Sequence, residues 1–344
     1  MKKYLLRQDL PFFKSNLHCH STVSDGLKTP EELKKIYQDK GYSILAYTDH
    51  DVFIFHDDLA DENFLPLHGF EMEITEPGDK PFRQRKTCHI CLIALEKDHK
   101  IQPMWHRRYE NYLFANALKY VDQVQFDESL PDYERRYDGQ CISEMIQEGR
   151  KQGFFVTYNH PGWSKERYPQ YSEYSGMHTF EIMNGGCIVA GFDDYNPRVY
   201  DDFLDQGKRI YCIGADDNHN VSPLDSPRSS SGAAFTMIQA ETLEYRAVTR
   251  ALEAGNFYAS QGPEIHALWL EDGLVHIRCS EAAAICYHAA ARSDGIAYPE
   301  EGKPLTEAAF PVRADDGWFR LEVRDKRGMH ACTNAYFTDE VLKD

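Results

Sequence analysis

Two histidines separated by one residue, His18 and His20, have the types and the spacing to bind a metal ion. On a strand, where side chains alternate, both point to one side and Cys19 points to the other. Imidazole nitrogens bind zinc, iron or manganese, so the pair supplies part of a coordination shell. The polar run from Ser21 to Gly26 predicts that this strand ends in a loop. A complete site requires further ligands from elsewhere in the chain.

Further histidines and acids lie on, or directly after, other predicted strands. Strand-like runs cover residues 15–20, 43–48, 64–74, 87–95, 154–158, 180–183, 209–214 and 233–238. They carry or precede His50, Glu71, His89, His160, Asp217 and His219. Because the carboxyl ends of parallel strands meet at one face of a sheet or barrel, we expect these side chains to lie together there.

The elements that must position these residues alternate between strand and helix. Helices are predicted at about 29–40, 143–151, 196–206 and 241–253, the first begun by a capping box of Thr29 and Glu32. Alternation of this kind indicates an α/β fold with a parallel sheet or barrel. From Gly262 onward, short strand-like runs separated by turn residues predict a small antiparallel β-sandwich. We therefore expect two domains, residues 1–261 and 262–344.

Composition narrows the classes of partner. Lys and Arg number 38 against 55 Asp and Glu, a formal net charge of −17, which disfavours binding to nucleic acid and to anionic membranes. No stretch approaches the length of a membrane span. Nine scattered cysteines, an odd number, favour reduced thiols and a cytoplasmic location.

Six motifs, taken in order, carry a resemblance to a known family. They are His18-Cys19-His20-Ser21 with Asp25-Gly26, Thr48-Asp49-His50-Asp51, Gly69-Phe70-Glu71, His89, His160-Pro161 and Asp217-Asn218-His219. In these motifs the chain resembles the PHP (polymerase and histidinol phosphatase) family of metal-dependent phosphoesterases. The resemblance implies a distorted (β/α)7 TIM-like barrel that holds two or three divalent metal ions, with zinc, manganese and iron as the candidates.

The resemblance also implies a division of the ligands among the metals. One metal would take His18, His20 and Asp217, a second His89 and His160, and a third Asp25, His50 and His219. Glu71 would bridge the first two metals, because a carboxylate can hold two cations. Glu73 lies on the same strand face, so spacing does not choose between the two acids, whereas the family's Gly-x-Glu favours Glu71.

The expected reaction is hydrolysis of a phosphoric ester of a small molecule by a hydroxide that bridges two metals. Glu71, His20 and Asp217 are the expected catalytic residues. Arg228 and Lys165 follow ligand-bearing strand ends and are the expected contacts of the substrate phosphate.

Other functions and assemblies stay open. Residues 251–263 resemble a subgroup that includes carbaryl hydrolase-like proteins, which leaves hydrolysis of carboxyl esters, carbamates or amides as an alternative. A PHP module that binds metal without catalysis is another. The sequence also leaves open a homo-oligomer.

Overall fold

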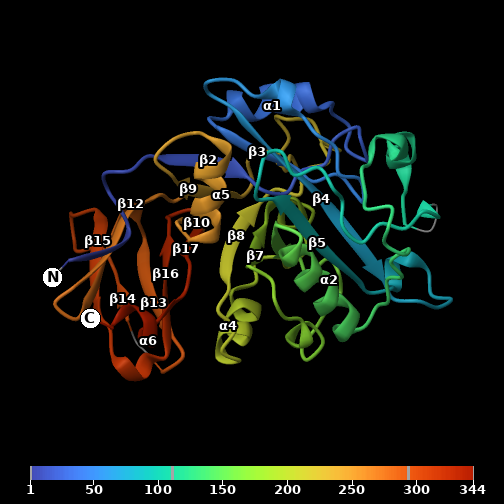
Figure 1. Cartoon of the computed structure of the whole chain (residues 1–344). Helices are drawn as coiled ribbons and strands as arrows, with labels where there is room; N and C mark the ends of the chain where they lie inside the picture. The colour runs from blue at the N-terminus through green and yellow to red at the C-terminus, as the bar shows by residue number, and fades with distance from the viewer. Residues whose placement is uncertain (1, 110–111, 293–294, 344) are drawn as a thin grey trace.

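A computed structural model of the chain describes residues 2–109, 112–292 and 295–343. It has an α/β region and a β-rich region, and both termini lie at the β-rich region (Figure 1). Seven strands of the α/β region are neighbours in space in their chain order. They are β2 (Phe12–Asn16), β3 (Ile44–Tyr47), β4 (Leu65–Thr75), β5 (Thr87–Ala94), β6 (Phe154–Tyr158), β7 (Thr179–Asn184) and β8 (Tyr211–Ala215).

Most of these strands run parallel, but β5 does not. The pairs β2–β3, β3–β4, β6–β7 and β7–β8 are parallel, whereas β5 is antiparallel to both β4 and β6. The expectation of a wholly parallel arrangement is therefore wrong at β5. The physical reason is the connection: no α-helix lies between β4 and β5, only a short 3-10 helix at Phe82–Gln84, so the chain reverses and the two strands pair directly.

The first and last of these strands approach each other at their carboxyl ends. A parallel bridge joins Cys19 to Asn218. The N–H of His20 donates to the carbonyl of Asn218 at 3.0 Å, and the N–H of Asp217 donates to the carbonyl of His18 at 3.0 Å. The segment after β2 thus lies beside the segment after β8. We call these contacts the β2–β8 seam.

In the described part of the chain, five α-helices accompany the α/β strands: α1 (Pro30–Asp39), α2 (Gly139–Lys151), α3 (Gly185–Val189), α4 (Pro197–Asp205) and α5 (Tyr245–Glu253). The capping box of Thr29 and Glu32 is confirmed at the start of α1. Helix α2 begins earlier than expected because the side chain of Asp138 accepts the N–H of Cys141. Short 3-10 helices are η1 (Asp57–Leu59), η2 (Phe82–Gln84), η4 (Ala115–Lys119), η5 (Val121–Gln123), η6 (Tyr171–Glu173) and η7 (Ala314–Asp316).

The β-rich region has two sheets. One is β1 (Lys3–Leu6), β11 (Ile265–Glu271), β12 (Leu274–Ala282) and β15 (Leu305–Pro311); the other contains β13 (Ala284–Ala289), β14 (Ile296–Ala297), β16 (Trp318–Arg324), β17 (His330–Thr333) and β18 (Tyr336–Phe337). Leu268 from the first sheet and Leu321 from the second belong to one buried hydrophobic cluster. The chain ends with α6 (Thr338–Val341).

Backbone pairing crosses the expected domain boundary after residue 261. Strands β9 (Phe235–Gln239) and β10 (Phe257–Ser260) connect β2 to β17 in one continuous hydrogen-bonded sheet. Strand β1, which was not predicted, pairs with β11 of the β-rich region. The boundary itself stays a prediction.

Two further expectations bear on the chain's setting. All nine cysteines are buried and free of disulfides. No helix among the described residues is long and apolar enough to cross a membrane.

Candidate metal centre

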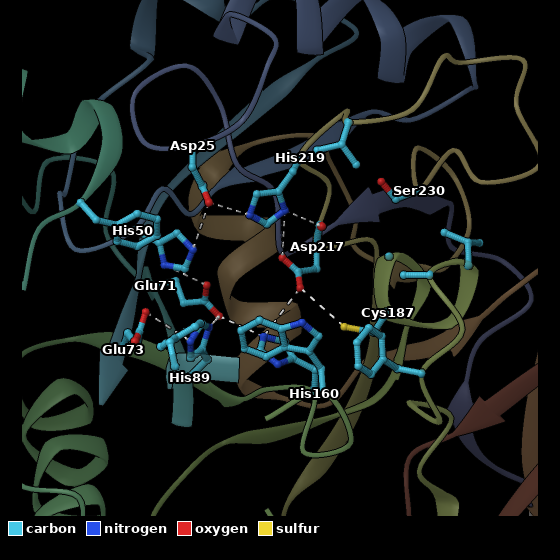
Figure 2. A pocket seen from close by; sticks show the side chains of 18 of the residues that line it. Asp25, His50, Glu71, Glu73, His89, His160, Cys187, Asp217, His219 and Ser230 are labelled. Carbon is cyan, nitrogen blue, oxygen red and sulfur yellow. Dashed lines mark hydrogen bonds and ion pairs between the residues drawn. The ribbon is translucent and has the colours of Figure 1, made fainter. Parts of the chain in front are cut away.

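The nine candidate ligands form one cluster of neighbouring side chains. Seven of them line a cavity: Asp25, His50, Glu71, His89, His160, Asp217 and His219 (Figure 2). The nine follow β2 (His18, His20 and Asp25), follow β3 (His50), lie in β4 (Glu71) and β5 (His89), follow β6 (His160) and follow β8 (Asp217 and His219). The expectation that every ligand sits near a carboxyl end is wrong for His89, which lies near the start of β5. It still reaches the cluster because β5 is antiparallel to β4 and pairs His89 with Glu73.

Glu71 lies at the centre of the cluster and is fully buried. Its Oε1 lies 3.1 Å from Nε2 of His18, 3.1 Å from Nδ1 of His89 and 3.3 Å from Nε2 of His160. Its Oε2 lies 3.4 Å from both Nε2 of His20 and Nδ1 of His50. Glu73 is less buried; of the candidate ligands it contacts only His89, at 3.7 Å, and it also accepts the hydroxyl of Thr75 at 2.6 Å. The geometry therefore puts Glu71, rather than Glu73, where a bridging carboxylate would have to be.

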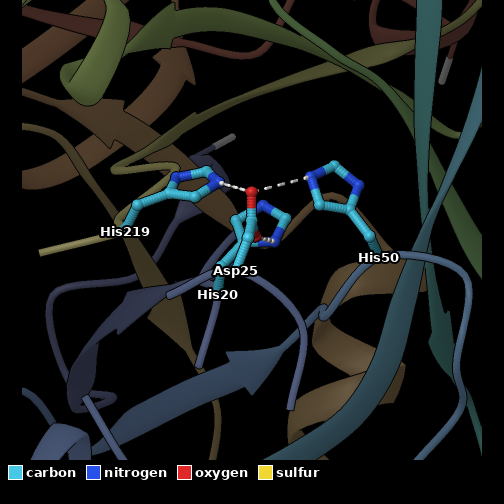
Figure 3. Close-up of side chains that lie close together, drawn as sticks. All are labelled: His20, Asp25, His50 and His219. Atoms are coloured by element: carbon cyan, nitrogen blue, oxygen red, sulfur yellow. Dashed lines mark ion pairs between the residues drawn. The ribbon is translucent and has the colours of Figure 1, made fainter. Parts of the chain in front are cut away.

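Two aspartates complete two groups of ligand atoms. Oδ1 of Asp217 lies 3.1 Å from Nε2 of His20 and 3.4 Å from Nε2 of His18. Oδ2 of Asp25 lies 3.3 Å from Nε2 of His219 and 3.9 Å from Nε2 of His50 (Figure 3). In each group, the ligand atoms are all within 4.8 Å of one another, as one metal ion requires.

Asp49 holds the loop that carries Asp25. Its carboxylate accepts the backbone N–H of Ser21 at 2.8 Å and that of Ser24 at 3.0 Å. The turn closes tightly at Gly26, where an added Cβ would lie 2.4 Å from the carbonyl oxygen of His20. Glycine is required here because the backbone of a ligand residue fills the space of a side chain.

Two ligands have unusual backbone conformations. His160 has φ of 24° and Asp217 has φ of 49°, both in the left-handed region that L-residues seldom adopt. Such strain persists only where surrounding contacts impose it, and it concentrates at functional sites. Here the N–H of His160 donates to Glu181 at 3.0 Å, and that of Asp217 belongs to the β2–β8 seam.

The donor set fits divalent metal ions. Among the described residues, Asp25, Glu71 and Asp217 have ion-pair contacts only with histidines, so no Lys or Arg neutralises them. Nδ1 of His20, Nδ1 of His50, Nε2 of His89 and Oε2 of Glu71 are buried without a hydrogen-bond partner. Buried charges and buried polar atoms are costly unless paired, and cations bound between imidazoles and carboxylates would pair both.

The charges of the cluster shift its pKa values in opposite directions. Burial works to raise the pKa of Glu71, but the surrounding imidazoles, His18 and His89 foremost, outweigh burial and hold it well below its ordinary value. Burial works to lower the pKa of His20, but Asp217 and Glu71 outweigh it and raise the pKa. Burial and the neighbouring His20 lower the pKa of His50. Burial likewise works to raise the pKa of Asp217, but His18 and His20 outweigh it and hold the pKa well below its ordinary value, so the cluster favours the ionised form of both carboxylates.

Sequence reasoning missed three residues around the ligands. Glu181 in β7 is fully buried, and its Oε1 lies 3.1 Å from Nδ1 of His18. The amide of Asn159 donates to Oε1 of Glu71 at 2.9 Å. Sγ of Cys187 lies 4.0 Å from Oδ2 of Asp217 (Figure 2). The only signal for Glu181 was an acid in an otherwise apolar strand, Phe180-Glu181-Ile182-Met183, which has no reason to bury a charge unless it has a partner.

The cavity above the cluster has a volume of about 680 Å³. Its floor includes Asp25, Glu71 and Asp217, and its walls are mainly apolar and aromatic. Arg228, one of the two expected phosphate contacts, lines the cavity and is exposed. Lys165 is exposed but is not among the described lining residues. The roles of Arg228 and Lys165 in substrate binding stay predictions.

Comparisons with known proteins add a structural likeness. No family model matches the chain, and no curated protein matches it. Among solved structures, it is similar to a two-domain protein from Bacteroides vulgatus that contains a predicted PHP-like metal-dependent phosphoesterase. The identity is 17%, the match covers 96% of this chain and 98% of that one, and the TM-score is 0.45.

Two other solved structures match over a smaller part of this chain. A proposed metal-dependent phosphoesterase from Bifidobacterium adolescentis is 14% identical, with 63% of this chain and 92% of that one covered and a TM-score of 0.39. An amidohydrolase from Chromobacterium violaceum is 16% identical, with 60% and 87% covered and a TM-score of 0.34. At these identities and scores, similarity does not say which reaction a chain catalyses. The likeness of residues 251–263 to the carbaryl hydrolase-like subgroup stays a prediction.

Proposed function

We propose that this protein is a metal-dependent hydrolase of phosphoric esters of small molecules. The observation that carries the proposal is the environment of Glu71, a fully buried carboxylate with imidazoles against both of its oxygens. A merely structural buried acid needs one or two hydrogen-bond donors, not five histidines and two further acids with no cationic side chain among them. Such a set suits several cations held side by side.

Two of the expected ligand sets coincide with groups whose ligand atoms lie within 4.8 Å of one another, and the third is taken from the family resemblance. His18, His20 and Asp217 would hold one metal, and Asp25, His50 and His219 another. His89 and His160, which both approach Oε1 of Glu71, would hold a third together with that carboxylate. When bound, divalent cations supply Lewis-acid polarisation of a phosphoryl oxygen and lower the pKa of a water molecule.

The remaining contributions come from the chain itself. Glu71 keeps neighbouring ligand groups in register because its two oxygens face different histidines. Asn159 fixes the orientation of this carboxylate by donating to Oε1. Glu181 fixes the ring of His18 and the backbone of His160 at the same time. The apolar walls exclude bulk water around a bound ester, which strengthens every electrostatic contact on the floor.

We also infer that the seven strands close into the distorted (β/α)7 barrel that the sequence predicts. The β2–β8 seam supports this inference, because it joins the segments that directly follow the first and last strands of the series. Closure matters for function, since His18 and Asp217 are on opposite sides of the seam.

The proposal is tested by metal content and turnover together. The purified protein is analysed for bound metals, loaded with zinc, manganese or iron, and assayed against phosphomonoesters, phosphodiesters and carboxyl esters. We expect two or three metals per chain and hydrolysis of phosphoesters that disappears after chelation. Stoichiometric metal without turnover of any ester would instead indicate a binding module.

A second candidate function is hydrolysis of a carboxyl ester, carbamate or amide. The observation in its favour is the scarcity of cations: among the described residues that line the cavity, Arg228 is the one Lys or Arg. A neutral ester needs fewer cationic contacts than a phosphate does. Activity confined to carboxyl esters or carbamates in the same assay would select this candidate.

A further inference from the structure

The cavity walls expose large apolar side chains that no packing requirement explains. Phe82, Phe114, Phe192 and Val221 line the cavity, with 48%, 37%, 44% and 76% of their surfaces exposed. They come from separate segments: η2, the insertion between β5 and α2, the loop after α3, and the loop after β8. Exposed apolar side chains that converge from several segments on one concavity indicate a binding surface rather than chance.

This apolar wall begins directly at the candidate ligands. The ring of Phe114 lies 4.7 Å from that of His50. The ring of Trp163 lies 5.2 Å from that of His89 and 5.3 Å from that of His160. The alcohol part of an ester bound at the ligand cluster would therefore contact aromatic rings one or two bonds away from the ester oxygen.

The charges of the cavity are concentrated on its floor. Of its described lining residues, four are acidic, Asp25, Glu71, Glu73 and Asp217, and three of these are candidate metal ligands. Arg228, exposed in the loop after β8, is the one Lys or Arg. Once cations neutralise the floor, it attracts an anionic group, and the described walls offer only Arg228 rather than the several cationic side chains that a second phosphate would need.

Resting on the proposed function, we propose that the substrates are phosphate monoesters of aryl or arylalkyl alcohols. The phosphate binds at the cluster, and the apolar part of the alcohol packs against Phe114, Trp163 and the exposed side chains above them. Water attacks phosphorus, the bond between phosphorus and the ester oxygen breaks, and the proton from water passes to the departing alcohol. A volume of about 680 Å³ is ample for one aromatic ring with a short linker.

The test separates apolar recognition from intrinsic reactivity. Ethyl phosphate and 3-phenylpropyl phosphate have leaving alcohols of similar acidity but differ by seven carbons. Taking about half of the extra apolar surface as buried on the open wall, we expect kcat/KM to be about 100-fold higher for the phenylpropyl ester. The non-hydrolysable ethyl- and 3-phenylpropylphosphonates should show the same preference in calorimetric titrations of the metal-loaded protein.

Substitutions on the wall check where the preference arises. In a Phe82→Ser and Phe192→Ser double variant, the preference should fall about tenfold in both assays, since both side chains are exposed and can be replaced without opening a core. Tyr298→Ser, an equally simple change at a residue that is 65% exposed and outside the cavity lining, is the matched control and should keep the full preference.

The outcomes distinguish this inference from the proposed function. Equal kcat/KM values for the two esters, or a preference that survives in the double variant, would overturn the assignment of the wall. Absence of turnover for both esters, combined with selective binding of phenylpropylphosphonate that the double variant loses, would retain the ligand class and reject the hydrolase. Absence of both turnover and selective binding would reject the inference.

Discussion

Glu181 offers the sharpest test of the proposed metal ligation. Its Oε1 lies 3.1 Å from Nδ1 of His18, and its Oε2 accepts the backbone N–H of His160 at 3.0 Å and the amide of Asn184 at 2.9 Å. If Nε2 of His18 binds a metal, Nδ1 carries the proton and donates to Glu181. The carboxylate then satisfies three donors on two oxygens, all of them buried.

Glu181→Gln keeps the size of the side chain and breaks this balance. An amide has one oxygen, so its NH₂ group must face either His18 or the pair of donors from His160 and Asn184. A buried donor left facing another donor costs about 1–3 kcal/mol. Loss of a carboxylate that orients a metal-bound histidine typically weakens metal affinity about 10- to 100-fold, which is about 1.4–2.8 kcal/mol. The two estimates are similar. We therefore expect Glu181→Gln to lower the affinity for the metal that His18 binds by an amount in this range.

The assay is a competition titration of the metal-free protein against a chromophoric chelator, with metal content measured in parallel. Glu166→Gln is the matched control. Glu166 is equally buried and accepts from the hydroxyls of Tyr137 and Tyr158, at 2.8 and 2.6 Å, but is not bonded to a candidate ligand side chain. It should lose stability without losing affinity for metal. An affinity in Glu181→Gln within about threefold of the unsubstituted protein would refute the positioning role.

Four other outcomes are expected. Glu71→Gln should abolish hydrolysis and reduce the metal content measured by elemental analysis. Glu73→Gln, on the same strand but at the edge of the cluster, should keep its metal content. An equal loss of metal in the two variants would contradict the central place of Glu71. Saturating metal at about 1,000 times Kd should stabilise the fold by about 4 kcal/mol, seen as a higher Tm that a chelator reverses. Gly26→Ala should destabilise the protein by about 1–3 kcal/mol in denaturant unfolding, because the new Cβ meets the backbone of His20. Burial works to raise the pKa of Glu322, but donors from His288, His330 and other neighbours outweigh it and lower the pKa. The ionised Glu322 therefore contributes its full stabilisation above the unfolded pKa near 4.5, and this stabilisation is lost as the pH falls below that value. In urea unfolding, the stability of a Glu322→Gln variant should decrease less steeply at acid pH than that of the unsubstituted protein.

The strands and helices of the α/β region could be predicted because their signals are local. Apolar runs such as 154–158 and the cap at Thr29 depend on a few neighbouring residues, and they occur in the structure as β6 and α1. The direction of β5 was not predicted, although the connection before it carried a signal. Residues 76–86 are eleven residues with Pro77-Gly78 and Pro81, which is short for a helical crossover and typical of a turn between antiparallel strands.

In the candidate site, the ligands could be predicted from their residue types, whereas the residues around them could not. The histidines and acids stood out by type, and the structure brings all nine together. Glu181 did not stand out, since only the approach of His18 and His160 explains a buried acid in β7. The exposed apolar residues of the cavity wall, such as Phe192, could not be predicted either, because the type of an apolar residue does not show whether its side chain will be buried.

Strand β1 has a consequence for the order in which the protein is made. Tyr4 pairs with Trp269, so strand β1 has a partner that is synthesised 265 residues later (269 minus 4). At about 5–20 residues per second, this strand waits roughly 13 to 53 s with its backbone unpaired. All nine candidate ligands precede residue 220, and Gly232 and Ala234, whose N–H groups hold Asp216, also precede Trp269, so the ligand cluster can assemble during that wait. Newly made chains should therefore acquire metal before β1 docks, and slow docking of the N-terminal strand would be the last step of maturation.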